Sequence, residues 1–185
     1  DRDIRRYLRK KIPWWKLWEM SKRKRAWKII KLCPNLMVRP MLLSYIDVLV
    51  EKDKQSGIDY EKNKGLFTSS DVYKLLIKRW VVREANRINL ERREKFILDM
   101  NKFSISLAVD MFLHREERDG LYIQADNIVP FAEEHSINLS ELELKGKSLL
   151  NRDAIGRFKF AHKSILEFLI AKHAVEDISF AQGVV

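Results

Sequence analysis

The side chains best suited to catalysis or metal binding are few in this 185-residue chain, which has four histidines and one cysteine. His114, His135, His162 and His173 are scattered and lack the close spacing typical of metal-ligating histidines. Cys33 has no sequence context that marks a nucleophile, and no Ser-His-Asp or Cys-His arrangement can be argued. We therefore expect neither a preformed zinc site nor a catalytic centre in this segment.

The known phosphate-binding loops are absent from the sequence as well. Neither G-x-x-x-x-G-K-[ST] nor G-x-G-x-x-G occurs, and the metalloprotease pattern H-E-x-x-H is missing. Single side chains cannot replace a nest of backbone amides around a phosphate. We therefore expect the segment by itself to bind ATP or ADP weakly or not at all and to hydrolyse neither.

The net charge of +10 is concentrated at the start of the chain. Residues 1–39 contain 14 Lys and Arg against three acidic residues, a net charge of +11, whereas the remainder has a net charge of −1. Four of the five tryptophans, at positions 14, 15, 18 and 27, lie in the same segment. Such a segment can present a basic and aromatic surface to nucleic acid or nucleotide phosphates. The alternative is a basic helical face whose tryptophans form its buried side.

The composition favours a folded, mainly helical protein. Apolar residues make up 46% of the chain, and the low counts of 6 Gly and 4 Pro argue against a disordered or turn-rich all-β protein. A single cysteine excludes an internal disulfide and suggests a reducing compartment, so we expect the cytoplasm. No apolar run reaches the roughly 18 to 20 residues that span a bilayer. The chain opens with Asp1-Arg2-Asp3 and no initiator Met, which suggests a fragment of a longer protein.

Hydrophobic spacing predicts helices along most of the chain, with a solvated loop over residues 51–65. Thr68 to Asp71, Asp126 and Ser140 offer N-caps for three of the helices. In the clearest amphipathic pattern, apolar residues recur at steps of three and four positions. They are Phe96, Met100, Phe103, Leu107 and Met111. The expected helices cover residues 3–11, 15–32, 41–50, 72–82, 96–111, 126–134, 140–145 and 162–175.

A β-hairpin is predicted near the end of the chain. Two short strand candidates, 148–151 and 157–160, are separated by a segment in which Asp153 and Gly156 suit a turn. A third β-prone stretch covers 121–123. Helices followed by a hairpin and a final helix describe a winged-helix arrangement. The predicted fold is therefore mainly α, a helical bundle followed by a winged-helix domain with one small β-hairpin.

Several segments resemble the NACHT-type STAND NTPases. Residues 158–171, FKFAHKSILEFLIA, resemble the F-x-H-x-S-x-x-E-F-x-x-A signature that closes the winged-helix domain of that family. Residues 149–156 look like the hairpin that precedes this signature in bacterial members, and residues 71–77 resemble the family's "lY..li" helix. Residues 38–43 look like its N-P-x-x-L segment, although Arg39 stands where the family usually has Asn. Together these pieces cover nearly the whole chain.

The resemblance implies a division into a small helical domain at 1–65, a linking helix at 66–95, a winged-helix domain at 96–177 and a tail at 178–185. It further implies that a nucleotide-binding core, with its phosphate loop and Mg²⁺ ligands, precedes Asp1 and that another domain follows Val185. In the family, the histidine matched by His162 reaches the β-phosphate of ADP, and the proline matched by Pro40 packs near the adenine. Both residues are therefore expected to bind ADP or ATP.

Each of these two residues also has a purely structural explanation. His162 can cap the start of a helix after the hairpin. Pro40 can serve as an ordinary first-turn proline. The sequence alone leaves these alternatives open.

The function implied by the resemblance is regulatory. The segment would hold the ADP-bound resting state of a STAND ATPase and open for oligomerisation, in bacterial antiphage immunity. Its partners would be its own nucleotide-binding domain and further copies of the protein, with no membrane partner. The alternative is a winged-helix nucleic-acid-binding module that uses residues 1–39 for phosphate contacts. The predicted winged-helix region is not basic, so any nucleic-acid binding is expected to be non-specific.

Overall fold

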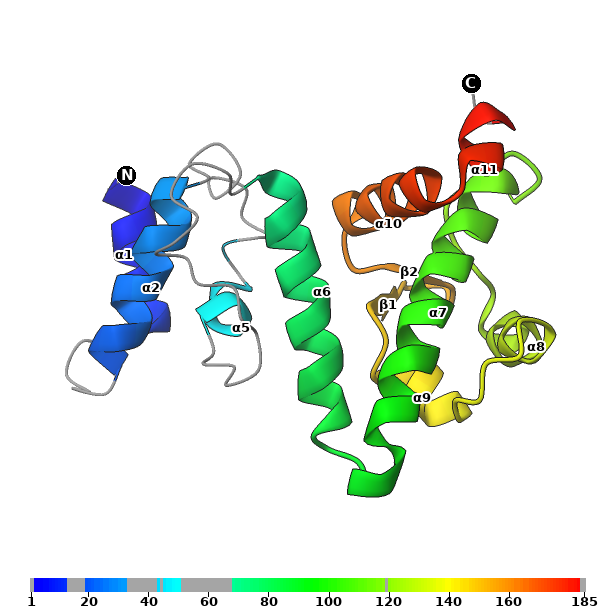
Figure 1. Ribbon diagram of the computed structural model, residues 1–185, viewed down its shortest axis with the longest axis horizontal. Coiled ribbons are helices and arrows are strands. Elements are labelled where there is room, and N and C mark those ends of the chain that lie inside the picture. The colour runs from blue at the N-terminus through cyan, green and yellow to red at the C-terminus, as the bar shows by residue number, and fades with distance from the viewer. Residues whose placement is uncertain are drawn as a thin grey trace. The chain divides into compact units, whose positions relative to one another are not determined.

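The computed structural model describes residues 2–12, 19–32, 43, 45–50, 68–118 and 120–183. This part of the chain is mainly helical, as predicted, with a two-stranded antiparallel sheet (Figure 1). Its elements, in chain order, are α1 (Arg2–Lys11), α2 (Glu19–Leu32), α5 (Ile46–Val50), α6 (Ser69–Ala85), the 3-10 helix η1 (Leu90–Arg92), α7 (Arg93–Leu113), the 3-10 helix η2 (Ala125–Asn127), α8 (Ile128–Glu134), α9 (Glu141–Gly146), β1 (Leu150–Arg152), β2 (Phe158–Phe160), α10 (Lys163–Glu176) and α11 (Ile178–Gly183).

The chain folds into two compact units. The first unit is Asp1–Trp80 and the second is Val81–Val185. The boundary between them lies inside α6, which is continuous from Ser69 to Ala85. Buried apolar residues occur in both units.

The first unit buries the apolar sides of its short helices. On α1 the buried residues are Ile4 and Leu8, and Ile12 directly after the helix is buried as well. Their spacing of four residues places them on one face of the helix. Helix α2 buries Ala26, Ile29 and Ile30 and packs against α5.

Two arginines bind the carbonyl groups at the end of α5. The Nε of Arg25 on α2 donates to the carbonyl of Val50 over 3.0 Å, and an Nη of the buried Arg79 on α6 donates to the carbonyl of Leu49. The last carbonyls of a helix have no partner within the helix, so these guanidinium groups satisfy them. Long basic side chains therefore join three segments of this unit.

Helix α6 begins with a reciprocal cap between Thr68 and Asp71, within the predicted capping segment. The amide of Asp71 donates to Thr68 Oγ1 over 3.3 Å, while the amide and hydroxyl of Thr68 each donate to Asp71 Oδ2 over 2.8 Å. These hydrogen bonds stabilise the ionised carboxylate, the backbone bond most strongly, and lower the pKa of Asp71. The prediction of a helix start here is confirmed.

The core of the second unit forms around α7. Its five predicted core residues, Phe96, Met100, Phe103, Leu107 and Met111, are all buried, which confirms the expected amphipathic helix. Helix α7 packs most extensively against α10. The residues that α10 buries are Ser164, Ile165, Leu166 and Leu169.

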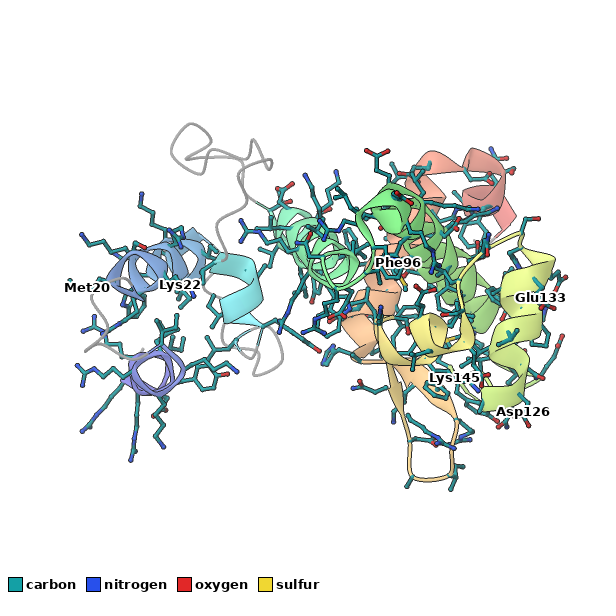
Figure 2. The ribbon with its side chains drawn as sticks, turned by 90° about the horizontal axis from the view of Figure 1, so that it is seen from below. Met20, Lys22, Phe96, Asp126, Glu133 and Lys145 are labelled. Carbon is teal, nitrogen blue, oxygen red and sulfur yellow. The ribbon has the colours of Figure 1, made fainter. Side chains whose placement is uncertain are left out.

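The prediction that Asp126 caps the next helix is wrong. Asp126 is exposed and lies inside the 3-10 turn η2, and α8 follows without a side-chain cap at its start (Figure 2). An N-cap residue needs non-helical backbone angles. The residue with an extended backbone is Gln124 (φ −67°, ψ 145°), so the chain is already turning when it reaches Asp126. The predicted end of the helix at Glu134 is confirmed.

Helix α9 begins with the capping box predicted at Ser140. The amide of Glu143 donates to Ser140 Oγ over 3.4 Å, and the amide and hydroxyl of Ser140 each donate to Glu143 Oε2 over 2.9 Å. Arg92 lies 3.4 Å from the same carboxylate oxygen. Burial raises the pKa of Glu143, but these hydrogen bonds and the nearby charges outweigh burial, so the pKa is lowered.

We expect Glu143→Gln to lower the free energy of unfolding by about 1.5–3 kcal/mol at pH 7, the range for hydrogen bonds to charged groups. Because the folded-state pKa is below the unfolded one, ionised Glu143 stabilises the fold above the ordinary glutamate pKa of about 4.3. That stabilisation is lost as the pH falls through the lowered folded value. Urea unfolding at a series of pH values should therefore show the difference between variant and wild type shrinking below about pH 4. Glu141→Gln, at a carboxylate that is 64% exposed, is the matched control. A pH-independent difference would contradict the role of the charge.

The predicted β-hairpin is confirmed, with its first strand shifted along the chain. Leu150 pairs with Phe160, and Arg152 pairs with Phe158. The first strand covers 150–152 instead of 148–151 because Ser148 lies in the bend that follows α9, where its Oγ donates to the carbonyl of Leu144.

The β-prone stretch 121–123 joins the hairpin through one residue. Ile123 and Phe158 exchange two backbone hydrogen bonds of 2.9 and 2.8 Å in an isolated antiparallel bridge. In the hairpin turn, which adjoins this bridge, Gly156 has a φ of +90°, which a residue with a side chain rarely adopts. Asp153 closes this turn by accepting hydrogen bonds from the amides of Ile155 and Arg157.

Candidate functional site

His162 lies between β2 and α10 and caps that helix. Its backbone is extended (φ −153°, ψ 144°), and its carbonyl accepts a hydrogen bond from the amide of Ile165 over 3.0 Å. The Nδ1 atom of its ring accepts from the amide of Ser164 over 3.1 Å and lies 2.7 Å from Ser164 Oγ. The helix expected from His162 therefore begins at Lys163, with the imidazole as its cap.

The cap determines which ring nitrogen of His162 carries the proton. An acceptor at Nδ1 must be unprotonated, so in the neutral ring the proton resides on Nε2. The imidazole is only partly buried, and its Nε2 forms no hydrogen bond with the residues that the structure describes. An N–H donor is therefore available to a ligand while Nδ1 holds the helix start.

The surroundings of His162 favour an anion. Helix α10 has 14 residues, and its N-terminal end carries the positive end of the helix dipole. Its first turn contains no acidic residue, and its first residue is Lys163, whose side chain is 73% exposed and whose Nζ lies 3.5 Å from Oε1 of Glu167. Lys159 on the adjacent strand is also exposed. The imidazole therefore lies at the positive end of this helix dipole.

The other predicted site residue, Pro40, lies outside the described residues. It belongs to the first unit and His162 to the second. The structure therefore describes one half of the predicted nucleotide contact.

An open groove in the second unit was not predicted from the sequence. Its volume is about 390 Å³, and its lining includes His114, His135 and His173 from three separate helical segments. His114 and His135 directly follow α7 and α8, and their Nδ1 atoms lie 3.0 and 2.9 Å from the carbonyl oxygens of Asp110 and Phe131. These histidines satisfy helix C-terminal carbonyls. The sequence feature that could have indicated this role is the position of both histidines just after predicted helices.

One acidic side chain of the groove, Asp110, binds two neighbouring basic side chains. Asp110 lies 2.9 Å from His114 through Oδ1 and 2.6 Å from Arg118 through Oδ2. In the part of the chain that the structure describes, no group of three or more His, Cys, Asp or Glu residues is arranged to hold a metal ion. Within this groove, the carboxylate of Asp110 is therefore already bound by basic groups.

None of the helices in the described ranges is both long and apolar enough to cross a membrane. No protein-family model, curated protein or solved structure matches the sequence or the fold.

Proposed function

We propose that this chain is the regulatory helical and winged-helix segment of a NACHT-type STAND switch and that His162 contacts its nucleotide. The observation that carries the proposal is the cap geometry of His162. The residue that matches the family's phosphate-contacting histidine uses Nδ1 to hold α10 and keeps Nε2–H available to an acceptor. A structural cap and a phosphate contact are therefore compatible in one side chain.

The order of elements in the second unit supports a winged-helix domain. Helix α7 is followed by the bridge at Ile123, then by α8, α9, the β1–β2 hairpin and α10. The bridge adds a third extended segment beside β2, as the first strand of a winged helix would. The signature at 158–171 then covers the second strand of the hairpin and most of α10.

The proposed switch depends on one contact that the resting state makes and the open state lacks. In the resting state, Nε2–H of His162 donates to the β-phosphate of ADP, which a preceding domain holds together with Mg²⁺. A hydrogen bond to a charged group is worth about 1.5–3 kcal/mol, which biases a two-state equilibrium about ten- to a hundredfold. Exchange of ADP for ATP removes the bias, the winged-helix domain rotates away as a rigid body, and copies of the protein assemble. In a bacterial cell this switch would act in antiphage defence.

The alternative, a winged helix that reads DNA, is less well supported by the charges. In that arrangement α9 would lie in the major groove. It has only six residues, and its side chains include Glu141, Glu143 and Leu142, which is 76% exposed. Glu143 is buried in its capping box, and Glu141, whose side chain is 64% exposed, would be repelled by the phosphates that line the groove. The switch therefore accounts better for the second unit.

Calorimetry with ADP tests the proposal. The 185-residue chain alone is expected to bind ADP weakly or not at all, because a histidine donor and a helix end cannot replace a phosphate loop. A longer protein that includes the residues preceding Asp1 is expected to bind with micromolar or tighter affinity. Micromolar binding by the 185-residue chain, or no binding by the longer protein, would contradict the assignment.

A further inference from the structure

We propose that the exposed faces of α1 and α2 bind the phosphate backbone of duplex nucleic acid without reading its sequence. The two helices contain twelve Lys and Arg and two acidic residues, a net charge of +10. This equals the net charge of the whole chain. All of the excess positive charge is therefore gathered on 24 residues in two helices.

The basic side chains of this surface face the solvent. Every Lys and Arg of α1 is exposed, whereas Ile4 and Leu8 of the same helix are buried. Figure 2, which shows α1 end-on, has nitrogen-tipped side chains extending from it on the side away from α2. The exposed basic residues of the two helices are Arg2, Arg5, Arg6, Arg9, Lys10, Lys11, Lys24, Lys28 and Lys31.

The positive charge of α1 is not neutralised within the described residues. No carboxylate among the described residues forms an ion pair with Arg2, Arg6 or Arg9. The arginines of the second unit differ, because several of them lie within 3.4 Å of a carboxylate oxygen. These pairs are Arg87–Glu84, Arg92–Glu143, Arg118–Asp110 and Arg157–Asp153. Like charges gathered without counter-charges repel one another, and a polyanion relieves that repulsion.

The same helices favour duplex nucleic acid over a membrane surface or a single strand. An amphipathic helix that binds a bilayer inserts its apolar face, but Ile4, Leu8 and Ile12 are already buried in the first unit. Binding of single strands relies on aromatic rings on which bases stack. Trp27 is partly buried, and the guanidinium of Arg5 lies 5.4 Å from its ring centroid. Arginine is suited to phosphate because its planar guanidinium can donate two parallel hydrogen bonds.

This proposal is independent of the nucleotide switch. It rests on α1 and α2 of the first unit, whereas the switch rests on His162 in the second. Either can fail without the other, since the ligand here is a nucleic-acid backbone and the measurement involves no ADP.

The test is fluorescence anisotropy of the 185-residue chain with a labelled 25-bp DNA duplex of random sequence, titrated at several KCl concentrations. Wild type should bind with a Kd of about 1–100 µM near physiological salt, and its affinity should fall steeply as salt rises. Arg2→Gln/Arg6→Gln/Arg9→Gln should lower the slope of log K against log salt by about three and weaken binding at least about tenfold at 0.1 M KCl. Glutamine preserves helix propensity, and circular dichroism will verify folding.

The control variant is Lys78→Gln/Lys95→Gln/Lys102→Gln, which removes the same charge from exposed positions on α6 and α7. It should bind like wild type within about twofold and lower the slope by less than one. Should the α1 variant unfold, Lys24→Gln/Lys31→Gln on α2 replaces it, with an expected slope change of about two.

Loss of DNA affinity in the α1 or α2 variant alone supports the proposal. Equal losses in the test and control variants would overturn it, because binding would then follow the overall charge. Tighter binding to single-stranded DNA, or binding to phosphatidylserine vesicles without binding to the duplex, would overturn it as well. Binding to an RNA duplex of the same length with the same slope supports it, since the proposed contact is to phosphates.

Discussion

Replacing Phe103 by alanine is expected to lower the free energy of unfolding of the second unit by about 3–5 kcal/mol. Phe103 is 1% exposed in the middle of α7. Its ring and that of Phe131 on α8 form an edge-to-face pair, with ring centroids 6.1 Å apart and an interplanar angle of 72°. The substitution removes this aromatic contact and leaves a cavity that the helices around it can close only in part.

Two spectroscopic signals can assign the Phe103 effect to the second unit. All five tryptophans, at positions 14, 15, 18, 27 and 80, belong to the first unit. Tryptophan fluorescence therefore follows the first unit, whereas far-UV circular dichroism follows the helices of both. In urea, Phe103→Ala should shift the circular-dichroism transition to lower denaturant.

Leu98→Ala is the matched control for Phe103→Ala, since Leu98 lies on the same helix and is 70% exposed. It should change the free energy of unfolding by at most about 0.5 kcal/mol. Equal destabilisation by the two substitutions would show that α7 does not form the core of the second unit.

The second large effect is expected at His162 in the longer protein that includes the nucleotide-binding domain. His162→Ala should weaken ADP retention about ten- to a hundredfold and raise the oligomer fraction, because the resting state alone loses a phosphate contact. It should also cost about 1 kcal/mol of stability, because the cap of α10 is lost. ADP retention after gel filtration and the melting temperature measure the two effects separately.

His162→Asn separates the cap from the nucleotide contact. Asparagine is a good N-cap, since its side-chain oxygen can accept from the amide of Ser164, so this variant should melt close to wild type. It lacks the Nε2–H donor, so it should release ADP as readily as His162→Ala. His173→Ala, in the same helix, should retain ADP normally. If His162→Asn retains ADP like wild type, the role of His162 is confined to capping.

Local patterns in the sequence predicted much of the second unit. The spacing of Phe96, Met100 and Phe103 specifies one buried face of a helix whatever packs against it. Ser140 followed three residues later by Glu143 is a complete signal, because both partners of the capping box lie within one turn. The cap by His162 is equally local, although the sequence could not choose between the cap and the phosphate contact.

Other features depend on contacts that no short stretch of sequence contains. Asp126 lies within the 3-10 turn that precedes α8, and only the backbone angles show that it is not an N-cap. Glu143 lies beside Arg92, which is 51 residues earlier in the chain. The groove lined by His114, His135 and His173 exists because three helices meet, so its histidines looked unrelated in the sequence.

The continuity of α6 limits how the protein can be divided for experiments. The unit boundary after Trp80 assigns twelve residues of this 17-residue helix to one unit and five to the other. Isolated helices shorter than about 12–15 residues are marginal in water, so cleavage there would leave two frayed ends. The shorter piece would still contain Val81 and Ala85, both 1% exposed in the intact chain, and would expose them to solvent. A recombinant second unit should therefore start before the cap at Thr68 so that the whole helix is retained.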